Sequence, residues 1–196
     1  MIWLLAAAQL SAPVPLQPLF DPNDVPIGHI DENELYTVGI AVTIKPDGKL
    51  QDCNIEATSG NRKLDAYTCG LVMRGGRFQR PVSSNGTPAY GIYRTFNIWW
   101  VGDRRPPAQP GKADLHIKVA ELPPKIKSPF LLRVAFDVDE AGNVSNCMAE
   151  EPKSNAALTR VACDQLLKTW KPIPARNAEG LRVPSVQDAT VVFEGV

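Results

Sequence analysis

The chain has 196 residues, of which 44% are hydrophobic and 21% charged, a composition typical of a globular protein with one or two domains. Its 21 Lys and Arg residues balance its 21 Asp and Glu residues, so no basic excess is available to neutralise phosphates and we expect no nucleic-acid partner. Most of the 18 prolines fall into two stretches, which predicts linkers there.

The N-terminus has an apolar run followed by small residues and a proline. Residues 1–12 resemble the apolar region and cleavage zone of a secretory signal peptide, although no Lys or Arg precedes the run. The apolar residues 2–10 would rise only about 14 Å as a helix, against a hydrocarbon core of about 30 Å. We therefore predict a signal peptide over residues 1–12, a Pro-rich linker over residues 13–34 and no integral membrane span.

The sequence contains an internal repeat with an offset of 94 positions. All four cysteines, one leucine and two glycines in each half obey it. The matched pairs are Gly48 and Gly142, Cys53 and Cys147, Leu64 and Leu158, Cys69 and Cys163, and Gly86 and Gly180. A repeat of this kind indicates two copies of one structural unit.

Each copy is predicted to run strand, turn, strand, helix, loop, strand. In the first copy Val38, Ile40, Val42 and Ile44 alternate with less apolar residues, and a Pro-Asp-Gly turn follows. Apolar residues at helical spacing come next, after the N-cap candidates Asn61 and Asn155 of the two copies. The third strands are expected at residues 90–100 and at about 186–193.

These patterns predict an α+β protein made of two tandem small domains, each a three-stranded antiparallel sheet packed on one helix. The first domain is expected over residues 35–101 and the second over residues 130–196, with a Pro-rich linker over residues 102–129. Within that linker the alternation of Leu115, Ile117 and Val119 predicts one more strand at the edge of the second domain.

The four cysteines are predicted to form disulfides. They contain no CxxC pair, and the two histidines lie in or beside the linkers, which disfavours a zinc site and a redox-active dithiol. A pairing internal to each copy predicts Cys53 with Cys69 and Cys147 with Cys163. Disulfides indicate an oxidising compartment, whereas the alternative of buried free thiols would fit a cytosolic protein. We predict no metal and no cofactor.

Several motifs of the first copy occur in a known family. The stretch Gly39-Ile40-Ala41-Val42-Thr43-Ile44-Lys45-Pro46-Asp47-Gly48-Lys49-Leu50 resembles the C-terminal domain of TonB family proteins, which are periplasmic energy transducers of Gram-negative bacteria. Thr58-Ser59-Gly60, Leu64-Asp65, Arg77-Phe78 with Pro81, and Gly86-Thr87-Pro88 resemble the same family. The second copy is divergent: Thr159 stands where the aspartate is expected, and the copy is linked to the family through the repeat.

The resemblance implies a binding role in the periplasm. Domains of this family pair an exposed sheet edge with a short peptide segment of an outer-membrane receptor, which is β-strand addition. The family's transducers also have an N-terminal membrane helix and a long Pro-rich spacer, and this sequence contains neither in full. We therefore expect a periplasmic or secreted protein that binds an envelope protein or peptide, with an outer-membrane receptor as the candidate partner, rather than an energy transducer.

The strand over residues 90–100 is the most aromatic part of the chain. If Ile92, Phe96 and Ile98 face the core, the residues that alternate with them face a partner or the solvent. The candidate binding residues are then Tyr93, Thr95, Asn97 and Trp99.

No catalytic signature is present, since the sequence has no GxSxG, HExxH or phosphate-binding loop. We therefore predict a protein without enzymatic activity. A secreted structural or inhibitor-like module of the envelope, with no role in transport, is the alternative to the binding protein.

Overall fold

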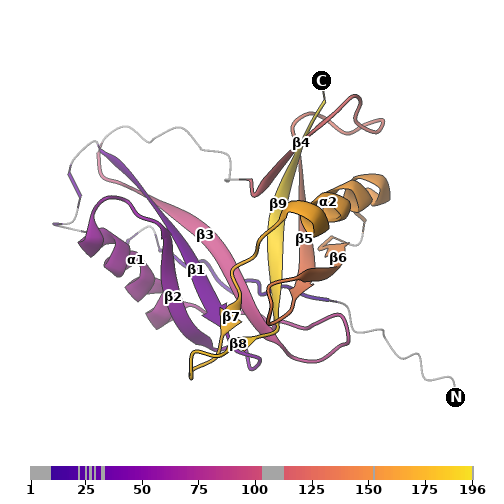
Figure 1. Cartoon of the computed structure of the whole chain (residues 1–196). Helices are drawn as coiled ribbons and strands as arrows, with labels where there is room; N and C mark the ends of the chain where they lie inside the picture. The colour runs from indigo at the N-terminus through magenta and orange to yellow at the C-terminus, as the bar shows by residue number, and fades with distance from the viewer. Residues whose placement is uncertain are drawn as a thin grey trace, which may run out of the picture.

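A computed structural model describes residues 10–21, 23–24, 26, 28, 30–31, 34–102, 113–151 and 153–195. Its two halves share the order strand, strand, helix, strand (Figure 1). The first half consists of β1 (Leu35–Ile44), β2 (Leu50–Ala57), α1 (Arg62–Gly75) and β3 (Tyr90–Trp100). The second half consists of β4 (Leu115–Val119), β5 (Phe130–Val138), β6 (Val144–Ala149), α2 (Ala156–Thr169), β7 (Ala175–Arg176), β8 (Arg182–Val183) and β9 (Ser185–Gly195).

Each half is built on a central strand that is buried under one helix. β1 pairs antiparallel with β2 and β3, and β5 pairs antiparallel with β6 and β9. The alternate apolar residues of β1 pack against α1, as those of β5 pack against α2. Gly48 turns β1 into β2 with a φ of 84°, a conformation that glycine adopts without strain.

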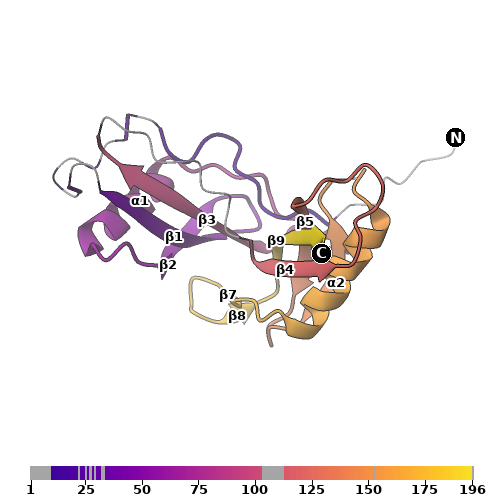
Figure 2. The ribbon, with the colours of Figure 1, turned by 90° about the horizontal axis from the view of Figure 1, so that it is seen from above.

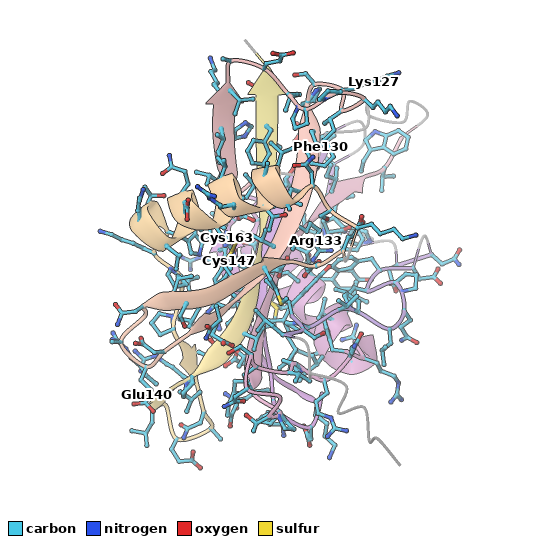
Figure 3. All side chains as sticks on the ribbon, turned by 90° about the vertical axis from the view of Figure 1, so that its right-hand side faces the viewer. Lys127, Phe130, Arg133, Glu140, Cys147 and Cys163 are labelled. Carbon is cyan, nitrogen blue, oxygen red and sulfur yellow. A yellow bond between two sulfur atoms is a disulfide. The ribbon has the colours of Figure 1, made fainter. Side chains whose placement is uncertain are left out.

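Both helices begin at the predicted asparagines and are joined to the sheet by disulfides. The side chains of Asn61 and Asn155 each accept two hydrogen bonds from backbone amides of the first helical turn. One disulfide joins Cys53 of β2 to Cys69 of α1, and the other joins Cys147 of β6 to Cys163 of α2 (Figure 3). These are the two pairs that the repeat predicts.

The prediction of two separate three-stranded sheets is wrong. Seven of the described strands form one mixed sheet with the order β2-β1-β3-β9-β5-β6, to which β4 adds by pairing with β9, and β7 and β8 form a separate two-stranded sheet. The two halves meet where residues 90–92 of β3 pair in parallel with residues 185–187 of β9. Joining the third strands removes part of two exposed sheet edges, which is the physical advantage of one sheet over two.

The two helices cover opposite faces of this sheet. Ile92 and Gln187 are partners across the junction, so their side chains point to the same face. Ile92 packs with Ala41, on the sheet face opposite the core that α1 covers. Gln187 points to the same face as the alternate residues of β9, such as Val191, that pack under α2. The face opposite α1 is therefore continuous with the face that carries α2, and Figure 2 shows the two helices on opposite sides.

Each half covers the sheet face that the other half's helix leaves bare. Ala41 and Ile92 of the first half are buried against Ala175, which lies in the β7–β8 hairpin of the second half. Their counterparts at the repeat offset, Ala135 and Val186, are buried against the N-terminal segment of the chain. These two small clusters explain why the halves form one body.

The end of the predicted signal peptide and parts of both predicted linkers belong to the folded core. Leu10 and Ala12 of the predicted signal peptide lie in the second half's cluster, and Ser11 exchanges two backbone hydrogen bonds with Val82. In the first predicted linker, Leu19 and Phe20 pack against the core of the first half. Residues 1–9, which include most of the predicted signal peptide, lie outside the described residues. The strand predicted around Ile117 is β4, and it edges the second half as expected.

Candidate functional site

The residues of the aromatic strand β3 that were expected to bind a partner lie on the face that α1 covers, whereas Ile92, which was expected in the core, is buried on the other face. The candidate binding residues Tyr93, Thr95, Asn97 and Trp99 alternate along β3 on the face that α1 covers. Trp99 is only 6% exposed, and its indole Nε1 donates to Thr68 Oγ1 at 2.8 Å. The ring of Tyr93 packs on Phe78 with 5.2 Å between centroids. Trp99 therefore fixes β3 to α1 and does not face the solvent.

The backbone of β3 provides a different kind of site. Along its whole length β3 pairs with β1, but on its other side it pairs with β9 only at residues 90–92. Among the described residues, no strand lies on that side of residues 93–100. This part of β3 is an open sheet edge, and such an edge accepts another strand through its free amides and carbonyls.

The second half contains a strand at the equivalent position. Beyond its junction with β3, β9 pairs in parallel with β4, over residues 191–195 and 115–119. The repeat offset of 94 relates β9 residues 191–195 to residues 97–101 in the first half. β4 is therefore an example, within the same molecule, of a strand added to the third strand of the repeated unit.

A cleft of about 1340 Å³ opens where β3 and β9 diverge. In Figure 1 the two strands meet near the bottom of the sheet and separate upward. We call the junction the narrow end of the cleft and the opposite side its wide end. The described lining residues belong to β1, β2, β3, β5 and β9, to the segments before β4 and before β5, and to the turns before each helix.

An ion-pair cluster on β3 closes the narrow end of the cleft on one face of the sheet. Arg94 lies 3.1 Å from Glu56 of β2 and 2.9 Å from Asp114, which precedes β4. Asp114 also pairs with Thr190 of β9, because its carboxylate accepts the Thr190 amide and its own amide donates to the Thr190 carbonyl, each at 2.8 Å. The guanidinium of Arg94 stacks on Trp170 at 5.0 Å.

A second ion-pair cluster lies on the opposite face. Arg133 of β5 lies 2.7 Å from Asp188 of β9 and 3.3 Å from Glu150, which follows β6. Burial raises the pKa of Asp188 and of Glu150, and the attraction of Arg133 only partly opposes this. Both carboxylates therefore lie in surroundings that disfavour their negative charge.

The two clusters are related by the repeat, a signal that the sequence contains but that our prediction missed. Glu56 corresponds to Glu150, and Arg94 corresponds to Asp188, at the offset of 94. Arg133 corresponds to Gly39, where an added Cβ would lie 3.0 Å from the Cβ of Ala57. The copies therefore share one carboxylate position, that of Glu56 and Glu150. The arginine lies on the third strand in the first copy and on the central strand in the second.

The turn between β2 and α1 borders the cleft and is held by a buried carboxylate. Asp65 accepts hydrogen bonds from the hydroxyls of Thr58 at 2.6 Å and Ser59 at 2.7 Å, and from the Ser59 amide at 3.0 Å. Burial raises the pKa of Asp65, but these three hydrogen bonds outweigh it and leave the pKa below its usual value. In the second copy Thr159 replaces this aspartate and donates to the Asn155 carbonyl instead.

Comparisons of the chain with protein-family models, with curated proteins and with solved structures find no match. The two disulfides place the protein in an oxidising compartment outside the cytoplasm. Within the part of the chain that the structure describes, no helix is long and apolar enough to cross a membrane. The same residues contain no group of three or more His, Cys, Asp or Glu side chains arranged to hold a metal ion.

Proposed function

We propose that this protein is a non-catalytic binding protein of the Gram-negative periplasm that takes up an extended peptide segment of an envelope partner along the open edge of β3. The segment adds a strand to the sheet, so backbone hydrogen bonds supply most of the affinity. A segment of an outer-membrane receptor is the partner that the resemblance to the TonB C-terminal domain favours.

The observation that carries this proposal is the contrast between β3 and β9. Each is the third strand of one copy of the repeated unit. The two strands pair up to residue 92 of β3 and residue 187 of β9 and diverge beyond these residues. β9 is covered there by β4, whereas residues 93–100 of β3 have no described strand beside them, and residues 93–96 of this stretch line the cleft. The unit therefore accepts a strand at this position, and one of its two copies has room for a strand from another protein.

The resemblance to TonB C-terminal domains supports the same site. The motifs Thr58-Ser59-Gly60 and Leu64-Asp65 meet in the turn that Asp65 holds beside the cleft. The family's peptide segment binds by strand addition to a sheet edge, the type of surface that β3 offers. A secreted structural module without a binding partner remains the competing function, and the test below separates the two.

Three fluorescent peptides derived from β4 provide the test. Each peptide contains Leu115–Val119 and the residues on either side of it, and its apolar residues are unchanged. Positions 116 and 118 both carry lysine in the first peptide, glutamine in the second and glutamate in the third. Fluorescence anisotropy measures their binding to the intact, oxidised protein. We expect at least one peptide to bind with a dissociation constant in the micromolar range.

N-methylated peptides are the matched controls. A bound strand presents alternate amides to β3, so methylation of one alternate set should abolish binding, while methylation of the other set should leave it unchanged. Failure of all three peptides to bind, or binding that neither methylation affects, contradicts strand addition and favours the structural module.

A further inference from the structure

Among the residues that the structure describes, the lining of the cleft carries an excess of negative charge, in a chain whose formal net charge is zero. Its cationic side chains are Arg94, Arg133 and Lys153. Its carboxylates are Glu56, Asp114, Glu150, Glu151 and Asp188. An uncharged segment bound in the cleft would leave this excess uncompensated.

Both arginines are already engaged by carboxylates of the cleft. Arg94 pairs with Glu56 and Asp114, and each ion pair is at most 3.1 Å long. Arg133 pairs in the same way with Glu150 and Asp188. Each cluster thus has one cation for two carboxylates, and neither arginine is available for an acidic residue of a partner without breaking an existing pair.

The two clusters lie on opposite faces of the sheet at the same end of the cleft. Arg94 has the parity of Ile92, on the face that carries α2, whereas Arg133 and Asp188 have the opposite parity on β5 and β9. Successive side chains of a strand point to opposite faces. A strand added to β3 therefore directs one residue toward each cluster.

Two lysines outside the lining lie near the other end of the cleft. Lys125 and Lys127 flank Ile126, a lining residue of the turn before β5. Figure 3 shows Lys127 beside Phe130 at one end of β5, with Arg133 farther along the strand. The acidic excess therefore belongs to the narrow end, near Arg94 and Arg133.

The sequence of β4 is an example, within this molecule, of an added strand without acidic residues. Leu115, Ile117 and Val119 pack toward the core, and the alternate residues His116 and Lys118 are exposed. The strand that already occupies the equivalent position on β9 thus alternates apolar residues with one histidine and one lysine and has no acidic residue.

We infer that the segment bound on β3 is a strand in which apolar residues alternate with lysine or arginine, and that its basic side chains lie beside the two carboxylate-rich clusters at the narrow end of the cleft. The inference rests on the proposed function, because it specifies the chemistry of the partner for the same edge. Electrostatic complementarity of this kind selects among strands that all make the same backbone hydrogen bonds.

The three β4-derived peptides test the inference when they are compared at low and high salt. We expect the lysine form to bind about tenfold more tightly than the glutamate form at low ionic strength, with the glutamine form between them. The difference should shrink in 0.5 M NaCl (roughly a 4 Å Debye length), because salt screens exposed charges. Equal affinities overturn the inference but leave strand addition standing, whereas absence of all binding overturns the proposed function.

Charge reversal in the protein gives a second, independent measurement. Glu151→Lys changes an exposed residue of the cleft lining, and the matched control Glu140→Lys changes an exposed residue of the β5–β6 turn, far from Arg133 in Figure 3. We expect Glu151→Lys to weaken binding of the lysine peptide about threefold and Glu140→Lys to leave it unchanged. An equal effect of both variants would show that only the net charge of the protein matters and would contradict the inference.

Discussion

The guanidinium of Arg94 on β3 lies 2.9 Å from the carboxylate of Asp114, the residue before β4. Asp114 also accepts a hydrogen bond from the backbone amide of Thr190 on β9. Thr190 lies between residues 185–187 of β9, which pair with β3, and residues 191–195, which pair with β4. This ion pair therefore joins the two strands that border the narrow end of the cleft, and it fixes where β3 and β9 separate.

Loss of the Arg94 side chain should destabilise the junction of the halves. Arg94→Ala removes two ion pairs to partly buried carboxylates, and we expect a loss of about 1–2 kcal/mol in the free energy of unfolding, because these groups retain some solvent. Urea unfolding measures the effect. Arg160→Ala, on the exposed side of α2, is the control and should change stability by less than about 0.5 kcal/mol.

The buried hydrogen bond between Trp99 and Thr68 should be important for stability. Thr68→Val keeps the shape of the side chain but leaves the indole Nε1 of Trp99 without its acceptor, at a cost of about 1–3 kcal/mol. Thermal unfolding followed by tryptophan fluorescence measures this cost, with Thr169→Val at the exposed end of α2 as the control. Equal stabilities of the two variants would contradict a structural role for Trp99.

The N-terminal segment should contribute to folding although its sequence resembles a signal peptide followed by a linker. Leu10 is 8% exposed in the second half's cluster, whereas Leu16 is 66% exposed. Leu10→Ala should therefore lower the free energy of unfolding by about 2 kcal/mol, and Leu16→Ala should have little effect. Chemical unfolding of both variants distinguishes a buried segment from a linker, for which the two changes would be equivalent.

Asp65 should make the stability of the first half depend on acid pH. Its folded-state pKa lies below the unfolded value of about 3.9, so its contribution is complete above that value and is lost as the pH falls through the folded-state pKa. Asp65→Asn should be less stable than the wild type at pH 7, and the difference should narrow toward pH 2. A difference that is constant over this range would exclude the proposed ionised carboxylate.

The two disulfides should contribute similarly, because each closes a loop with a sequence separation of 16. Replacing Cys53 and Cys69 together by alanine should cost about 3 kcal/mol, and so should replacing Cys147 and Cys163. Calorimetry of the two double variants measures these costs. A large inequality would show that the copies differ in how much structure they retain when unfolded.

The sequence predicts the repeated unit well because local signals define it. Alternating apolar residues, the turn at Gly48 and the asparagine caps specify strands and helices within each copy. The order of elements, the pairing of the cysteines and the extra strand around Ile117 follow from the same patterns.

The joining of the two sheets depends on contacts between distant segments and was not predicted. β3 carries apolar residues on both faces, since Trp99 packs under α1 while Ile92 packs against Ala175 of the other half. The sequence of one copy alone therefore does not show which face of β3 is covered by the helix. The repeat does indicate this face, because Ala41 and Ile92 match Ala135 and Val186. In two separate domains these small or apolar residues would have nothing to pack against.

Amide hydrogen exchange of the intact protein, measured with and without the lysine form of the β4 peptide, tests the central claim most directly. The sheet has four open edges in its described part, on β2, on β6, on the side of β4 away from β9 and on residues 93–100 of β3. We predict that the peptide slows exchange at alternate amides of residues 93–100 and leaves β2, β4 and β6 unchanged. Protection confined to β2, β4 or β6, or no protection of β3 when the peptide is bound, would contradict strand addition at β3.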